Sequence, residues 1–325
     1  GFFDDDNSLW GRTLNGIKIE NPKFINNLKY DIDQVFLAMP NLNQKRIQEI
    51  TNFIKLENIE VLLVPSIDDL TSGKVHINKI RPVSIDDLLG RDSVISMQGL
   101  IEPFIKNRNI CVTGGAGSIG SEICRQIINL GANSLVVIDN NEHNLFQIQK
   151  ELESKFTNKT IIYILEDVSN QIALEKIFKN YFIDIVYHAA AYKHVPILES
   201  NPLIGIKNNV FSTLSVCKAG KSCNLRNVIL ISSDKAVRPA NLMGATKRLS
   251  EIIVLYFHKM GKEVIYKSNN KTYFSMVRFG NVLGSSGSVV PIFKKQIKKG
   301  GPITITHPKI NRYFMTIKEA SELVI

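Results

Sequence analysis

Three adjacent side chains in the second half of the sequence could exchange protons with a substrate. Ser233, Asp234 and Lys235 follow the run Val228–Ile231, at the point where a buried strand would end. A carboxyl group and an amine held side by side can act as an acid and a base, because each shifts the pKa of the other. Taken alone, the same residues are more typical of a strand-end turn with a solvated ion pair.

Met243 and Lys247 come next and are spaced i, i+4, so they share one face of the helix expected over residues 243–260. A thioether carries no transferable proton, so Met243 is neither an acid nor a base. Two interpretations are open. Either the site is inactive, with Met243 in the core and Lys247 a surface charge, or proton transfer falls to the three residues at the strand end.

A glycine-rich turn predicts a dinucleotide site. Glycines at 114, 117 and 120 follow the strand that ends at Thr113 and open a helix, so the backbone can approach a diphosphate at the helix N-terminus. The next strand ends at Asp139, whose carboxylate would accept hydrogen bonds from a ribose and repel a 2′-phosphate. Residues 140–144 contain no Arg or Lys, which favours NAD over NADP. The cofactor contacts that we expect are Thr113, Gly114, Gly117, Ser118, Ile119, Gly120, Asp139, Asn140, Asp167, Val168, Ala189, Ala190 and Ala191.

The elements that position these residues alternate regularly from Asn109 onward. This pattern predicts an α/β fold with a doubly wound parallel sheet of the Rossmann type. We expect its strands at 110–113, 135–138, 161–165, 184–188, 228–232 and 274–278, and its helices at 118–130, 142–155, 170–180, 203–223 and 243–260. A shorter strand–helix–strand pattern over residues 35–64 predicts a smaller, truncated Rossmann-like domain. The expected domains are therefore 1–80, a linker 81–108, and a catalytic domain 109–325 that is cut short at its C-terminal end.

Composition narrows the classes of protein further. The chain has 325 residues, 44% of them hydrophobic, which excludes disorder, and its apolar runs are too short for a membrane span. The four cysteines form no CxxC pair, so we expect buried thiols and no metal site. Net charge is −3 over residues 1–100 and +13 over residues 101–325, which indicates an anionic ligand, an anionic membrane surface or nucleic acid. Nucleic acid fits worst, because no basic stripe is interleaved with aromatic residues.

Four segments together carry a family pattern: TGGAGSIGSEICRQI, HAAAYKHVPILESNP, SSDKAVRPANLMGATK and VRFGNVLGSSGSVVP. The chain resembles the polysaccharide-biosynthesis branch of the extended short-chain dehydrogenases, and more narrowly their UDP-N-acetylglucosamine 4,6-dehydratases. The likeness extends over essentially the whole chain. It implies a fragment lacking both ends of a larger homo-oligomeric protein, which is anchored to the membrane and works on a UDP-sugar at the cytoplasmic face.

The resemblance also implies roles for single residues. NAD would take a hydride from C4 of the sugar and return it to C6, giving a UDP-4-keto-6-deoxy sugar. Lys235 would remove the C5 proton and Asp234 would protonate the departing C6 hydroxyl. Ser233 and Lys247 would lie near the C4 hydroxyl, with Lys247 also binding the cofactor ribose and Met243 in the place of the usual tyrosine. The expected substrate contacts are Lys193, Asn281, Ser288, Val289 and Arg312.

The sequence departs from the family pattern at two positions, and two alternatives to the dehydratase prediction are open. Ser212 stands where the family usually has glycine, and Ser233 stands where some members have threonine, with the hydroxyl kept. The first alternative is a nucleotide-sugar epimerase on the same fold, which needs no acid directed at C6. The second is a non-catalytic NAD-binding regulatory module that has lost its tyrosine.

Overall fold

The structure is a computed structural model, and it describes residues 1–27, 32–39, 44–54, 60–64, 81–82, 98–263, 272–285, 287–305, 307–309 and 312–325. The chain divides into two compact units, Gly1–Ser93 and Val94–Ile325. The division falls inside the segment that we expected to be a linker. Residues 83–97 of that segment lie outside the described residues, and α3 (Gln98–Ile105) occupies part of the remainder.

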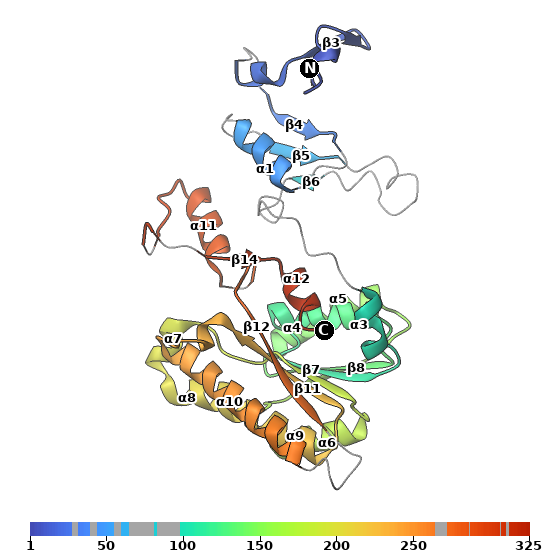
Figure 1. Ribbon diagram of the computed structural model, residues 1–325, viewed down its shortest axis with the longest axis vertical. Helices are drawn as coiled ribbons and strands as arrows, with labels where there is room; N and C mark the ends of the chain where they lie inside the picture. The colour runs from blue at the N-terminus through green and yellow to red at the C-terminus, as the bar shows by residue number, and fades with distance from the viewer. Residues whose placement is uncertain are drawn as a thin grey trace. The chain divides into compact units, whose positions relative to one another are not determined.

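The first unit contains two small sheets (Figure 1). In one sheet, β3 (Ile17–Glu20) pairs in parallel with β1 (Phe2–Phe3) and antiparallel with β2 (Thr13–Leu14). In the other, β4 (Gln34–Leu37) and β5 (Glu60–Leu63) are parallel, and β6 (Arg81–Pro82) is antiparallel to β5. Helix α1 (Gln44–Phe53) lies between β4 and β5 in sequence, so the strand–helix–strand unit expected from the sequence is present.

A six-stranded sheet, parallel throughout, forms the centre of the second unit (Figure 1). Its order is β12-β11-β10-β7-β8-β9, so the chain leaves β7 in one direction and returns to its other side with β10. That order confirms the predicted doubly wound Rossmann fold. The strands are β7 (Asn109–Thr113), β8 (Ser134–Asp139), β9 (Thr160–Leu165), β10 (Ile185–His188), β11 (Asn227–Ser233) and β12 (Tyr273–Phe279).

Apolar cores lie on the two faces of this sheet. One core takes side chains from α4 (Ser118–Asn129) and α5 (Glu142–Lys155), and the other from α6 (Gln171–Asn180), α9 (Ser212–Ser222) and α10 (Leu242–Glu263). Helix α12 (Ile317–Glu322) packs against α4, where Gln126 donates a side-chain hydrogen bond to the carbonyl of Lys318 (3.1 Å). None of the helices in the described part of the chain has the length and apolarity needed to span a membrane.

The expected helix over 203–223 is wrong in one respect, because the structure interrupts it. Helix α8 (Pro202–Ile206) is followed by a π-helical turn, η5 (Lys207–Phe211), and only then by α9. The hydroxyl of Ser212 donates to the carbonyl of Asn208 at this junction, so a side chain competes with the backbone for that acceptor. Such turns often mark functional sites, and Asn208 lines the cavity described below.

The cysteines follow the prediction with one exception. Cys111, Cys124 and Cys217 are buried, and burial raises the pKa of each thiol. Cys223 is only partly buried, because it is the C-terminal cap of α9, close to the surface. All four thiols are free.

Candidate active site

The glycine-rich turn connects β7 to α4 and brings the backbone close to the end of β10. Gly114 has φ +67°, and a Cβ there would lie 2.5 Å from the backbone of Ala190. A Cβ on Gly120 would overlap the carbonyl oxygen of Gly114, so this glycine lets α4 start directly on the turn. Gly117 is different, because a Cβ there would meet only the carbonyl of Gly114, at 3.3 Å. Its Cα surface is therefore open toward a ligand.

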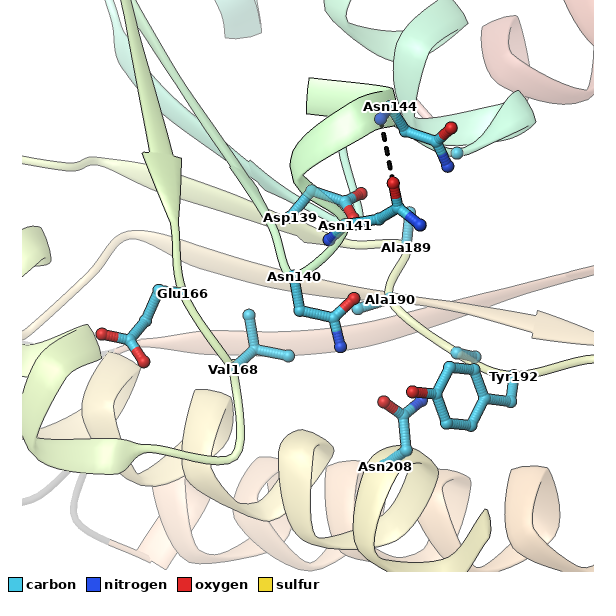
Figure 2. Close-up of a pocket in the computed structure, with 13 residues that line it drawn as sticks. Asp139, Asn140, Asn141, Asn144, Glu166, Val168, Ala189, Ala190, Tyr192 and Asn208 are labelled. Atoms are coloured by element: carbon cyan, nitrogen blue, oxygen red, sulfur yellow. Dashed lines mark hydrogen bonds between the residues drawn. The ribbon is translucent and has the colours of Figure 1, made fainter. Parts of the chain in front are cut away.

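A cavity of about 230 Å³ opens beside this turn, at the carboxyl ends of the strands (Figure 2). It lies where the strand order reverses between β7 and β10, which is the usual ligand position in such sheets. Its lining consists of glycine and alanine residues, the side chains of several asparagines, and two carboxylates. The lining residues are Gly114, Gly117, Asp139, Asn140, Asn141, Asn144, Glu166, Val168, Ala189, Ala190, Ala191, Tyr192 and Asn208.

Asp139 is held in place by the backbone on both of its carboxylate oxygens. One accepts a hydrogen bond from the amide of Ala116 (3.0 Å) and the other from the amide of Asn141 (2.9 Å). Each oxygen can accept a further bond, so the carboxylate is oriented and still able to receive two ribose hydroxyls. The lining also contains Glu166 and no Arg or Lys, so it offers no partner to a 2′-phosphate. The residues present fit NAD.

Several residues expected to contact the cofactor are absent from the cavity lining. Gly120 acts in packing, and Ser118 and Ile119 are the first two residues of α4. The carboxylate of Asp167 accepts from the amide of Ser169 (2.9 Å), so it closes a turn, while its neighbour Glu166 reaches the cavity. The residues that sequence reasoning missed are Asn141, Asn144, Glu166, Tyr192 and Asn208.

Thr113 and His188 form a buried hydrogen-bonded link beneath the cavity. His188 Nδ1 lies 2.7 Å from Thr113 Oγ1 and Nε2 lies 3.2 Å from Thr213 Oγ1. Thr213 already donates its proton to the carbonyl of Asn209 (2.8 Å), so Nε2 must be the donor and Nδ1 the acceptor. Burial, with the charge of Lys247, lowers the pKa of His188 to about 3, which keeps the ring neutral. Thr113 is therefore bound to His188 in the interior and does not line the cavity.

The segment that we expected to carry the chemistry follows β11 and turns immediately. Ser233 is the last strand residue, and Asp234–Ala236 form a short 3₁₀ turn, η6. Ser233 Oγ donates to Asp234 Oδ1 (2.9 Å), and Lys235 Nζ donates to the same oxygen (3.0 Å). Burial raises the pKa of Asp234, but the hydrogen bonds from Lys235 and Ser233 outweigh it and the net shift is downward. The alcohol, acid and amine thus form one hydrogen-bonded cluster.

Lys247 and Met243 both point into the protein. Lys247 is 9% exposed and donates to the carbonyl of Ile231 (2.9 Å), two residues before Ser233. Burial lowers the pKa of Lys247 to about 8, although Glu251 acts in the opposite direction. Lys247 is therefore not the surface charge that an inactive site would allow. Met243 is 5% exposed, so it packs in the interior at the start of α10.

Of the expected substrate residues, Asn281 lies at the cluster itself. Its Oδ1 accepts from Lys235 Nζ (3.3 Å), and β13 (Asn281–Val282) pairs in parallel with β14 (Phe314–Met315). That pairing places β14 beside Asn281. Arg312, which is exposed, comes shortly before β14 in the sequence.

The other three expected substrate residues lie in two neighbouring loops. Ser288 caps α11 (Val289–Lys298), and among the described residues its buried Oγ has no hydrogen-bond partner. Val289, the first residue of that helix, is half-exposed. Lys193 is exposed and adjoins His194, whose ring lies against Gly287. The Lys193 loop and the Ser288 loop are therefore neighbours.

Comparison with known proteins places this geometry in a family. The profile of a family described as "Polysaccharide biosynthesis protein" matches residues 110–325. The capsular polysaccharide biosynthesis protein CapD of Staphylococcus aureus is 42% identical over 91% of this chain and 48% of its own length. A UDP-N-acetylglucosamine 4,6-dehydratase (inverting) of Campylobacter jejuni is 34% identical over 67% of this chain and 62% of its own. The chain spans about half the length of the first of these relatives.

A solved structure shows the same arrangement of elements. The X-ray structure of Pen from Bacillus thuringiensis matches with a TM-score of 0.62 and 35% sequence identity. The match covers 68% of this chain and 65% of that one. The second unit, Val94–Ile325, makes up a similar share of this chain, so the matched region is about as long as that unit.

Proposed function

The chain belongs to the polysaccharide biosynthesis protein family, and on that premise we propose that it is a nucleotide-sugar 4,6-dehydratase that acts on UDP-N-acetylglucosamine. One observation carries the proposal. Ser233, Asp234 and Lys235 form a hydrogen-bonded cluster at the carboxyl end of β11, on the sheet edge that also holds the dinucleotide cavity. The dehydratase from Campylobacter jejuni supports the choice of sugar.

The cofactor is NAD, which when bound accepts a hydride from C4 of the sugar and returns it to C6. Gly114 and Gly117 leave the backbone open to the diphosphate, and Asp139 receives the adenosine ribose. Lys247, held by the carbonyl of Ile231, presents its ammonium to the nicotinamide ribose. The cavity lining contains Asp139 and Glu166 and no Arg or Lys, so it repels the 2′-phosphate that distinguishes NADP from NAD.

The Asp234–Lys235 pair needs no proton from solvent to reach its working form. In the free protein it is an ion pair, as the lowered pKa of Asp234 indicates. Moving one proton across the 3.0 Å hydrogen bond from Lys235 Nζ to Asp234 Oδ1 gives a neutral amine and a neutral acid. A bound sugar displaces water, which disfavours the two charges and therefore favours this neutral form. The amine then takes the C5 proton, and the acid protonates the C6 hydroxyl, which leaves as water. When the hydride returns to C6, the Lys235 ammonium gives a proton back to C5. Over the whole cycle, the proton that oxidation releases from the C4 hydroxyl replaces the one that Asp234 gives up.

The neighbouring residues orient the sugar. Ser233 places a hydroxyl beside Asp234, where it can bind the C4 oxygen. Met243 fills the interior and transfers no proton. In this proposal the substrate diphosphate and sugar are held by Asn281, Ser288, Val289, Arg312 and Lys193. The full-length protein is a homo-oligomer anchored at the cytoplasmic face of the membrane, and its product feeds polysaccharide or O-antigen synthesis.

A mass spectrum of the reaction in deuterated water tests the proposal. The protein with NAD and UDP-N-acetylglucosamine should yield a product that has lost one water and gained one solvent deuteron at C5. Lys235→Ala should abolish both changes, while a matched change at another lysine of a carboxylate pair, Lys106→Ala, should leave both intact. Binding of NAD without loss of water from the sugar would exclude the dehydratase.

The epimerase alternative predicts a different pattern. Epimerisation oxidises and reduces the same carbon and does not use an acid directed at C6. Asp234→Asn should therefore abolish water loss and still permit oxidation at C4 in a dehydratase, whereas an epimerase should keep its turnover. A non-catalytic module should bind NAD and tolerate Lys235→Ala without any change in a sugar.

A further inference from the structure

A fully buried carboxylate lies one helical turn beyond Lys247 and is unused by the proposed chemistry. The side chain of Glu251 is 0% exposed, yet it remains ionised. Burial raises the pKa of Glu251, but hydrogen bonds from Arg278, Ser232 and Arg248 outweigh that effect and lower it. A charge placed there requires a reason, because breaking such a buried pair is strongly destabilising while apolar replacements are often harmless.

Four hydrogen bonds saturate this carboxylate. Oε1 accepts from Ser232 Oγ (2.7 Å) and Arg278 Nε (2.7 Å), and Oε2 accepts from Arg278 Nη2 (2.6 Å) and Arg248 Nη1 (3.1 Å). Arg278 therefore binds in the two-pronged geometry that fixes both distance and orientation. Ser232 and Arg278 are partners in the pairing of β11 with β12, so the contacts join α10 to two neighbouring strand ends.

Two successive turns of α10 thus hold two successive residues of β11. Lys247 Nζ donates to the carbonyl of Ile231, and Glu251 accepts from the hydroxyl of Ser232. Ser233 and Asp234 follow directly. Any slip of α10 along the sheet would move Lys247 relative to these residues. The grip on Glu251 prevents that slip.

We propose that Glu251 is a positioning residue, whose carboxylate fixes both the place and the positive charge of Lys247 at the cofactor site. The inference rests on the part of the proposed function that places Lys247 at the cofactor, and it does not depend on which sugar the protein converts. Its electrostatic part is direct, since the negative charge of Glu251 favours the ammonium that burial disfavours.

The other titratable and charged groups around Lys247 do not replace this contribution. His188 on β10 is neutral, because burial lowers its pKa to about 3. The Asp234–Lys235 pair after β11 has no net charge. Glu199 of α7 (Val195–Ser200) bonds to the first residue of α10, a turn before Lys247. Arg248 and Arg278 are positive and would act against the ammonium if Glu251 were neutral.

The test is the affinity for NAD as a function of pH, measured by calorimetry without any sugar. In the unchanged protein the affinity should fall with a midpoint near pH 8, as Lys247 loses its proton. Glu251→Gln should move the midpoint down by about one pH unit, which weakens binding about fivefold at pH 8. Glu251→Asp restores the charge and should return the midpoint toward 8. Since no sugar is used, failure of the dehydratase proposal would leave this result intact.

A matched control separates positioning from mere stability. Glu151 on α5 is also bound in two prongs by Arg125, at 2.8 Å on each oxygen, and by Lys155 at 2.7 Å, but it does not contact Lys247. Glu151→Gln should lower the melting temperature and leave the NAD midpoint near 8. If Glu251→Gln behaves in the same way, Glu251 is structural only and the proposal is overturned.

A second variant keeps the test decisive if Glu251→Gln fails to fold. Arg278→Lys preserves the charge but removes the two-pronged grip. We expect it to weaken NAD binding severalfold at pH 7 without moving the midpoint. Unchanged affinity in Arg278→Lys would show that the grip does not position Lys247 and would refute the proposal.

Discussion

Two glycines three residues apart in one turn should respond to the same substitution in opposite ways. Gly117→Ala adds a methyl group where φ is −75° and ψ is 170°, an ordinary conformation for alanine. Its only close neighbour would be the carbonyl of Gly114 at 3.3 Å, and the methyl would occupy the cavity. The loss of a favoured N-cap residue and the gain in chain entropy offset each other to within about 1 kcal/mol. The free protein should therefore keep its melting temperature.

The same methyl group should weaken NAD binding, because it stands where the diphosphate must approach the backbone. We expect a loss of about 10- to 100-fold, or about 1.4 to 2.8 kcal/mol. Gly120→Ala is the contrasting change. Its Cβ would overlap the Gly114 carbonyl oxygen and lie 2.9 Å from Gly115 Cα, so α4 must shift. That overpacking costs about 3 kcal/mol, or about 6–12 °C in a domain of this size.

Calorimetric melting and NAD titration on the two variants decide the matter. Gly117→Ala should show a normal melting temperature with weak NAD binding, and Gly120→Ala a lowered melting temperature. Wild-type NAD affinity in Gly117→Ala would falsify the position given to the diphosphate. An unchanged melting temperature in Gly120→Ala would show that the approach of α4 to the turn is not tight.

Other parts of the second unit give further expectations. Asp139→Asn should weaken NAD binding about tenfold. It should also lower the ratio of NAD affinity to NADP affinity, because the amide no longer repels a 2′-phosphate. Titration of the variant with both dinucleotides measures the two effects. His188 has a lowered pKa, so the unfolded chain binds its proton first and stability should fall, by up to about 1.4 kcal/mol per pH unit, as pH drops below about 6.5. His188→Gln should flatten that slope in chemical denaturation, and an equal slope in both proteins would contradict the buried neutral ring. Cys223, the one cysteine that is partly exposed, should react first with a thiol reagent, and faster modification of Cys111 in the folded protein would contradict its burial.

The sheet could be predicted closely because its strands carry continuous apolar, β-branched runs. Fully buried parallel strands leave that signature in the sequence, and the observed bounds of β7 and β8 differ from the expected ones by a residue. The interruption of the helix at 207–211 left no such trace, because it depends on where one serine hydroxyl finds an acceptor. Asn208 lies in this interruption, and a regular helix did not predict its place at the cavity.

The candidate site was predictable where strand ends carry the chemistry, and not where tertiary contacts do. Asp139 ends β8 and the segment 233–235 begins on the last residue of β11, so the sheet alone brings them to one edge. Asp167 was expected at the cavity and Glu166 lies there instead, because the carboxylate of Asp167 accepts a hydrogen bond from the amide of Ser169 in the turn after β9. The contact of Asn281 with Lys235 joins residues 46 positions apart, and no local pattern encodes it.

The pairing of β13 with β14 has a mechanical consequence for the second unit. Strand β14 leads through Thr316, whose side chain caps α12, and α12 packs on α4, the helix that begins at the glycine turn. The segment that carries Asn281 and the segment that carries Gly117 are thereby braced by one continuous chain of contacts. Amide hydrogens in β13, α12 and the hydrogen-bonded turns of α4 should consequently exchange together, in a single opening event, and not at separate rates.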